Sequence, residues 1–212
     1  MIKVHHARRA RSVRVVWLLE ELGQPYEVRQ VEFTAEALRS AEYLAVHPLG
    51  QLPAIEDGDV TIFESGAILE YLLEQYGGGK LAPELRSRER AEYLQWFHFG
   101  EASLARYVSD VVRSRFGRNV APGVREEAGD SERSAAVLRY ARERIAPPLA
   151  LVDRTLRDRP FICGSDFSAA DIMVSYGLVM AKIIGELAPE YTHLAAYIER
   201  LKARPAYAKA WA

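Results

Sequence analysis

The segment GQLPAIEDGDVTIFESG, residues 50–66, constrains the fold of this chain most strongly. It predicts two short strands joined by a tight turn, with a helix starting directly afterwards. Pro53, which has no amide hydrogen to donate, stands where the first strand begins. Glu64 and Ser65 stand where the second strand ends. The backbone around Leu52 therefore need not pair within the sheet, and the next helix begins beside a carboxylate and a hydroxyl.

The segments on either side of this hairpin predict a small α/β domain. In chain order the patterns indicate strand, helix, strand, helix, the two hairpin strands and a helix, that is, β-α-β-α-β-β-α. The first helix is typical, because Val15, Leu18 and Leu22 fall on one face and Gly23 follows as the C-cap. We therefore predict a first domain over residues 1–78.

The remainder of the chain predicts a second domain that is entirely helical. Residues 79–86 lie within the segment GGGKLAPELRS and form the predicted linker. Beyond them apolar residues recur with helical spacing, so we predict an all-α helical bundle over residues 87–212. Within it, Ser168 and Asp171 match the spacing of a capping box at a helix start, which gives both residues a structural role.

The composition excludes several classes of function. Hydrophobic residues make up 49% and charged residues 27% of the chain, as in ordinary globular proteins, and the net charge of −1 gives no reason to expect nucleic acid or a membrane as partner. Since no apolar run approaches the ~18 residues of a membrane span, a cytoplasmic location is expected. Cys163 is the single cysteine. His5 and His6 point to opposite faces of a strand, and no metal site is expected.

The two ends of the hairpin suit a short peptide with a free amino-acid head. A helix start favours a carboxylate, Ser65 can add a hydroxyl donor, and Glu64 can hold an ammonium group. If the Leu52–Pro53 bond is cis, the polar backbone groups of Leu52 turn outward toward an extended peptide, and Gln51 can reach a second carboxylate. Each residue alone also has a structural explanation, as N-cap, solvated strand end or edge proline. Their combination indicates a binding site.

Three segments of the chain resemble those of a known family. HHARRARSVRVVWLLEELGQPYEV, HPLGQLPAIEDGDVTIFESGAILEYL and FICGSDFSAADIMVS are similar to segments of the cytosolic glutathione S-transferases, and look closest to the bacterial and fungal Gtt1-like members. The resemblance covers essentially the whole chain. It implies a thioredoxin-like first domain, glutathione as co-substrate and a homodimer. It also implies a cis Pro53, pairing of the Leu52 backbone with the cysteinyl part of glutathione, and Glu64 and Ser65 on the γ-glutamyl head.

The group that would activate the glutathione thiol is less clear from the sequence. A nearby hydrogen-bond donor and a helix start both stabilise a thiolate. In similar enzymes with a serine donor, that serine stands four residues before the arginine that aligns with Arg14, and this chain has Ala10 there. Ser12, Arg11 and the backbone amides of the first helix are therefore the candidate catalytic groups.

The electrophile is expected between the two domains, next to aromatic residues of the second. The candidates for lining its pocket are Trp96, Phe99, Tyr107 and Phe116. The leading hypothesis is a glutathione transferase acting on small hydrophobic electrophiles. One alternative is reduction of peroxides or disulfides by bound glutathione without a protein thiol. Another is a binding or interaction module without catalysis, which Ala10 favours.

Overall fold

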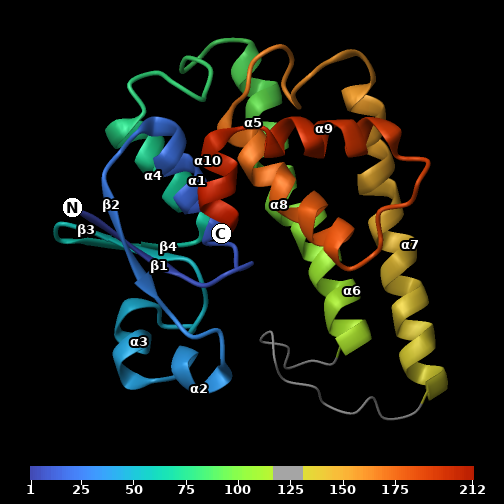
Figure 1. Cartoon of the computed structure of the whole chain (residues 1–212), viewed down its shortest axis with the longest axis horizontal. Coiled ribbons are helices and arrows are strands. Elements are labelled where there is room, and N and C mark those ends of the chain that lie inside the picture. Colours follow the sequence, from blue (N-terminus) through green and yellow to red (C-terminus); the bar gives the residue numbers. More distant parts are fainter. Residues whose placement is uncertain (117–130) are drawn as a thin grey trace. The chain divides into compact units, whose positions relative to one another are not determined.

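The structure, a computed structural model, describes residues 1–116 and 131–212, except for the side chains of residue 116 and residues 131–134 (Figure 1). The described chain forms two compact units. The first unit consists of residues 1–90 and 202–212, and the second consists of residues 91–201. The domain boundaries predicted from the sequence, at residues 1–78 and 87–212 with a linker at 79–86, stay a prediction.

The first unit is built on a sheet with the strand order β2-β1-β3-β4. Its strands are β1 (Ile2–His6), β2 (Tyr26–Gln30), β3 (Ala54–Asp57) and β4 (Val60–Phe63). β1 pairs parallel with β2 and antiparallel with β3, and β4 pairs antiparallel with β3. The β3–β4 turn contains Gly58 with a φ of 59°, a left-handed conformation that glycine adopts without steric cost.

The helices of the first unit complete a thioredoxin-like domain, as predicted. They are α1 (Val13–Leu22), α2 (Ala35–Leu38), α3 (Ala41–Val46), α4 (Ser65–Tyr76) and α10 (Pro205–Trp211). In Figure 1, α1 and α4 lie on one side of the sheet, and α2 and α3 lie on the other. The sequence predicts one helix for AEALRSAEYLAV, whereas Ser40, with φ −60° and ψ 146°, divides it into α2 and α3. The Ser40 hydroxyl accepts a hydrogen bond of 3.2 Å from the Tyr43 amide and caps α3.

The last helix, α10, packs on α1 and belongs to the first unit. The rings of Trp17 and Tyr207 meet edge to face with their centroids 5.0 Å apart. Next to them the Arg204 guanidinium donates two hydrogen bonds, of 2.6 and 2.7 Å, to the Glu21 carboxylate. This bidentate pair and the aromatic contact fix α10 against the outer face of α1.

The regular elements that the structure describes in the second unit are all helices, as predicted. Its elements are α5 (Glu89–Phe99), the π-helical turn η1 (Gly100–Ala105), α6 (Arg106–Phe116), α7 (Ser131–Thr155), the 3₁₀ turn η2 (Leu156–Asp158), α8 (Ala169–Ile183) and α9 (Thr192–Lys202). η1 packs against α8 at very short range. A Cβ atom on Gly100 would lie 2.5 Å from the Met173 carbonyl carbon, so only glycine allows this contact.

A capping box stands at the start of α8. Ser168 is the N-cap, and its amide donates a hydrogen bond of 2.8 Å to the Asp171 carboxylate. The same carboxylate accepts hydrogen bonds from the Ile162 amide at 2.8 Å and from the Tyr197 hydroxyl at 2.7 Å. Because Asp171 has an exposed fraction of 0%, burial raises its pKa, although these donors oppose that shift. Asp171 therefore joins three segments of the second unit.

Within the described residues, no helix combines the length and the apolar composition that a crossing of the bilayer requires.

Candidate functional site

The two ends of the β3–β4 hairpin lie side by side at one end of the sheet. Ala54 of β3 pairs with Phe63 of β4, so Pro53 and Glu64 are the next residues outward on the two strands. Ala54 also lies opposite His5 near the end of β1. The turn that follows β1 therefore starts at the same end of the sheet. The sheet register therefore brings together the backbone before β3, the start of α4 after β4, and the turn that follows β1.

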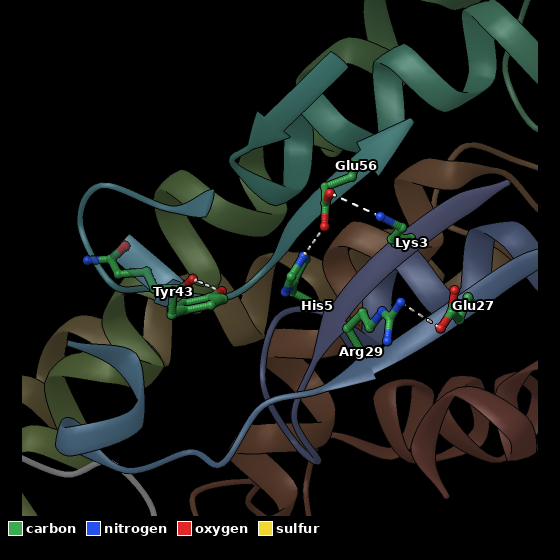
Figure 2. A network of polar contacts seen from close by, with 7 residues as sticks. Lys3, His5, Glu27, Arg29, Tyr43 and Glu56 are labelled. Atoms are coloured by element: carbon green, nitrogen blue, oxygen red, sulfur yellow. Dashed lines mark hydrogen bonds and ion pairs between the residues drawn. The ribbon is translucent and has the colours of Figure 1, made fainter. Parts of the chain in front are cut away.

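The Leu52–Pro53 peptide bond is cis, as the family resemblance implies. Both residues are buried, whereas the side chain of Gln51 is exposed to solvent. The Tyr43 hydroxyl, from α3, donates a hydrogen bond of 2.6 Å to the Gln51 carbonyl oxygen (Figure 2). Burial raises the pKa of Tyr43, so this phenol keeps its proton and remains a donor at neutral pH. The backbone before Pro53 is therefore held from α3.

Glu64 and Ser65 form the start of α4 in an unusual conformation. Glu64 has a φ of 71° and a ψ of 113°, which a residue with a side chain adopts only at a cost in free energy. Its side chain is exposed and makes no capping hydrogen bond to the helix. Since the first amides of a helix lack intrahelical acceptors, this start can receive an external carboxylate. Backbone strain of this kind is often found at binding sites.

Arg14 of α1 supports this helix start. Its exposed fraction is 1%, and its Nη1 donates a hydrogen bond of 3.0 Å to Ser65 Oγ. Ser65 is itself 3% exposed. A guanidinium next to the start of α4 adds positive charge where a carboxylate would bind. In the sequence Arg14 is one of several arginines near a helix start, and its neighbours Val13 and Val15 do not report its burial, because adjacent residues of a helix face different directions.

Ala10 lies in an apolar cluster next to the cis peptide. It is buried with Ala7, Leu38, Tyr43 and Leu52. The position at which similar serine enzymes carry their hydroxyl is therefore occupied by a methyl group in contact with apolar side chains.

Ser12 and Arg11 lie in the turn between β1 and α1. Ser12 has an exposed fraction of 0%, and its Oγ lies 2.9 Å from His6 Nδ1 and accepts a hydrogen bond of 3.3 Å from the Ala7 amide. Arg11 is half-buried. The hydroxyl of Ser12 is therefore enclosed by its own turn, whereas the longer side chain of Arg11 reaches solvent.

The first amides of α1 are also engaged. The amides of Val13 and Arg14 donate to the carbonyl oxygens of Ala10 and Arg11, each at 3.1 Å. These are bonds within the turn and tighten the start of the helix. Amides used in this way are poor donors to an external anion.

A polar network covers the sheet face beside α3 (Figure 2). The Glu56 carboxylate accepts a hydrogen bond of 3.3 Å from Lys3 Nζ and lies 2.8 Å from His5 Nε2. The hydrogen bond with His5, together with the neighbouring lysine, lowers the pKa of Glu56. On β2, Arg29 and Glu27 form a separate ion pair at 3.1 Å. The His5 ring lies 5.7 Å from the Tyr43 ring, so the network borders the residue that holds Gln51.

His47 was not singled out by its sequence context, yet it lies beside the end of β4. Its ring is buried, its Nδ1 accepts a hydrogen bond of 3.2 Å from the Leu49 amide, and its centroid lies 4.7 Å from that of Phe63. Burial lowers the pKa of His47, against the opposing influence of the Glu64 carboxylate. Burial also lowers the pKa of His6. Both rings therefore prefer the neutral form in the folded protein.

We expect the free energy of unfolding to decrease as the pH falls below about 6.5, the unperturbed pKa of histidine. The folded-state pKa of His47 and of His6 is lower than the unfolded value, so the unfolded chain binds more protons in this range. Urea unfolding at pH 7.5 and 5.5 measures the loss. His47→Asn keeps an acceptor for the Leu49 amide and should lose less stability than the wild type over the same interval. An equal loss in both proteins would contradict the role of His47.

The aromatic candidates of the second unit make different contacts. Trp96 is buried, and its ring meets that of Phe99 at 5.1 Å between centroids. Tyr107 is half-buried, and its hydroxyl accepts a hydrogen bond of 3.0 Å from Arg144 of α7. The side chain of Phe116 lies outside the described residues. That these residues line an electrophile pocket stays a prediction.

Metal ligands and the cysteine thiol also bear on the chemistry. In the part of the chain that the structure describes, no group of three histidine, cysteine or acidic side chains could hold a metal ion. Burial, with a smaller contribution from Asp171, raises the pKa of the Cys163 thiol to about 12. This thiol is therefore protonated at neutral pH and is a weak nucleophile.

Comparison with family models and curated proteins gives consistent matches. The model described as "Glutathione S-transferase, N-terminal domain" matches residues 1–74, and "Glutathione S-transferase, C-terminal domain" matches residues 53–200. Glutathione S-transferase 3 of Schizosaccharomyces pombe is 30% identical over 182 residues, covering 86% of this chain and 75% of that protein. The glutathione S-transferase-like protein OpS6 of Beauveria bassiana is 32% identical over 212 residues, covering 96% and 91%.

Solved structures match over nearly the whole chain. The theta class glutathione S-transferase of Xanthomonas axonopodis pv. citri, with glutathione bound, is 27% identical and has a TM-score of 0.79. The match covers 99% of this chain and 96% of that protein. Glutathione transferase F7 of Populus trichocarpa has a TM-score of 0.83, and the match covers 99% of this chain and 97% of that protein. At 23% identity this second match shows the fold alone.

Proposed function

This chain belongs to the glutathione S-transferase family, and we propose that it binds glutathione, stabilises its thiolate and transfers the sulfur to a small hydrophobic electrophile. The observation that carries this function is the meeting of Pro53 with Glu64 and Ser65 at one end of the sheet. A related structure holds glutathione on the same fold. Membership of the Gtt1-like group stays a prediction.

Each part of glutathione has a counterpart in the first unit. The start of α4 and the Ser65 hydroxyl receive the γ-glutamyl carboxylate, and Arg14 keeps Ser65 in position at 3.0 Å. Glu64 holds the ammonium group of the same head. The Leu52 backbone pairs with the cysteinyl part, and the exposed side chain of Gln51 reaches the second carboxylate. The carboxylate and the ammonium group are the two charged groups that distinguish a free amino-acid head from an internal peptide.

Arg11 takes the direct role in thiol activation, and Ser12 positions the turn that carries it. The Ser12 hydroxyl is enclosed by His6 and Ala7, and Ala10 has no hydroxyl. A guanidinium favours the anionic form of a nearby thiol, so the proton passes to solvent and the sulfur keeps its electron pair. The thiolate then forms a bond to the electrophilic carbon. Where that carbon carries a leaving group, the group departs with its bonding electrons.

The ultraviolet absorbance of the glutathione thiolate, titrated against pH with saturating protein, tests this function. A free thiol has a pKa of about 8.5, and we expect the bound thiol to fall below about 7.5. Arg11→Ala should return the value toward that of free glutathione, with a smaller effect on glutathione affinity. Ser12→Ala should change it less. Arg8→Ala, an exposed arginine of the same turn, is the matched control and should have no effect.

The other outcomes of this titration point to different functions. Glutathione binding without a shift of the thiol pKa favours a binding or interaction module, and the absence of binding removes the site assignment. Activity with peroxides or disulfides, but not with aryl halides, would identify the reductase alternative.

The remaining parts of the proposal concern the electrophile and the assembly. Trp96, Phe99, Tyr107 and Phe116 are the candidates for contact with a small hydrophobic electrophile. A cytoplasmic homodimer is the expected state of the enzyme, and sedimentation equilibrium measures its mass directly.

A further inference from the structure

An open depression of about 430 Å³ lies in the second unit, and its lining includes none of the residues assigned to glutathione. It is formed by η2 with the two residues after it, Arg159 and Pro160, and by α9. In Figure 1 the red helix α9 lies beside the end of α7 that η2 follows. The Leu194 amide at the start of α9 donates a hydrogen bond of 2.9 Å to Asp153 of α7, which fixes the two walls relative to each other.

Basic side chains dominate the lining of this depression. Arg157, Arg159, Arg200 and His193 line it, and Asp158 is the acidic residue of the lining. His193 and Arg200 are seven residues apart on α9 and therefore share one helical face. The short 3₁₀ turn and the extended backbone of Arg159 bring the other two arginines to the opposite wall.

Two of the three arginines have no carboxylate partner among the residues that the structure describes. Arg159 is already paired, because its Nη1 lies 2.6 Å from Glu92 Oε1 and its Nε donates to the Thr155 carbonyl oxygen at 3.0 Å. Arg200 Nη1 donates to the Pro160 carbonyl oxygen at 2.9 Å, which orients the guanidinium without cancelling its charge. Among the described residues, no carboxylate pairs with Arg200 or Arg157 within 4.0 Å. The depression therefore presents two guanidinium groups against one exposed carboxylate, Asp158.

We propose that this depression binds a phosphate group, either as inorganic phosphate or as a phosphate monoester. Guanidinium groups bind phosphate through two parallel hydrogen bonds, and a monoester carries about −1.5 to −2 charges at neutral pH. A dianion neutralises the two positive charges of Arg157 and Arg200 together, whereas a monoanion neutralises only one of them. The volume of 430 Å³ exceeds that of phosphate and leaves room for the organic part of an ester beside Leu156 and Ala196.

Isothermal titration calorimetry with the full chain tests the site, using inorganic phosphate and phenyl phosphate as probes at constant ionic strength. We expect saturable binding of at least one probe, and a loss of affinity of tenfold or more in Arg157→Ala with Arg200→Ala. Arg157→Ala alone should give a smaller loss. Arg154→Ala removes an exposed arginine of α7 outside the depression and should leave the affinity unchanged. Tighter binding of phenyl phosphate identifies a monoester, and equal binding identifies free phosphate.

Three results would overturn the site. These are the absence of saturable heat with both probes, an equal loss in the Arg154 variant, and the same heat when chloride replaces phosphate. Glutathione binding, measured on the same samples, should be unchanged in every variant. That measurement separates failure of the phosphate site from failure of the glutathione assignment.

Discussion

Replacing Glu64 and Ser65 together by alanine should raise the Kd for glutathione about 100-fold or more. The change removes a carboxylate from the ammonium group and a hydroxyl from the carboxylate of the γ-glutamyl head. Each hydrogen bond to a charged group contributes about 1.5–3 kcal/mol, and 1.4 kcal/mol corresponds to a factor of ten in affinity. Calorimetric titration of glutathione into the variant measures the change. Unchanged affinity would remove both residues from the site.

Three controls separate loss of binding from loss of folding. Glu64→Gln keeps the shape of the side chain and removes only its charge, so it should retain part of the affinity. Ser65→Ala also takes an acceptor from the Arg14 guanidinium, and urea unfolding of this single variant measures the structural cost. Glu74→Ala removes an exposed carboxylate from the same helix and should bind glutathione as the wild type does.

Asp171→Ala should lower the free energy of unfolding by about 3–5 kcal/mol, the range found when one partner of a buried charged network is removed. The carboxylate accepts hydrogen bonds from the amides of Ile162 and Ser168 and from the Tyr197 hydroxyl. All of these donors are buried, and alanine offers them no acceptor. The helix start also loses its capping box. Urea unfolding followed by circular dichroism at 222 nm, the usual helix signal, measures the effect.

The matched control is Asp166→Ala in the loop just before α8. Asp166 is exposed and accepts a hydrogen bond of 2.8 Å only from its neighbour Ser165 among the described residues. We expect a loss of less than about 0.5 kcal/mol, as for other surface changes. If Asp171→Ala cost no more than this control, the carboxylate would not connect the three segments.

The hairpin and the helix patterns could be read from the sequence because they depend on local spacing. Apolar periodicity indicated α1 and α4, and the EDGD turn with its glycine indicated the β3–β4 pair. The meeting of Pro53 with Glu64 also follows from the hairpin, because strands joined by a tight turn pair from the turn outward. The shared place of Pro53, Glu64 and Ser65 at one end of the sheet could therefore be predicted from local sequence, whereas the binding of a γ-glutamyl head there stays a prediction.

Other parts of the site depend on burial, which spacing does not report. Arg14 reads as one of several arginines near a helix start, and only its 1% exposure reveals the contact with Ser65. Ser12 reads as a free hydroxyl, whereas the fold encloses it beside His6. The break at Ser40 depends on a choice between continuing a helix and capping a new one, two states of similar free energy.

The first unit is assembled from two parts of the chain that are synthesised far apart in time. The ion pair between Glu21 and Arg204 joins residues 183 positions apart, with the whole second unit between them. On the ribosome, α1 and its Trp17 therefore emerge long before α10, which covers them. The second unit has its complete sequence before the first unit does. The usual order, in which the N-terminal part of a chain finishes folding first, is thus reversed for the last step of this protein.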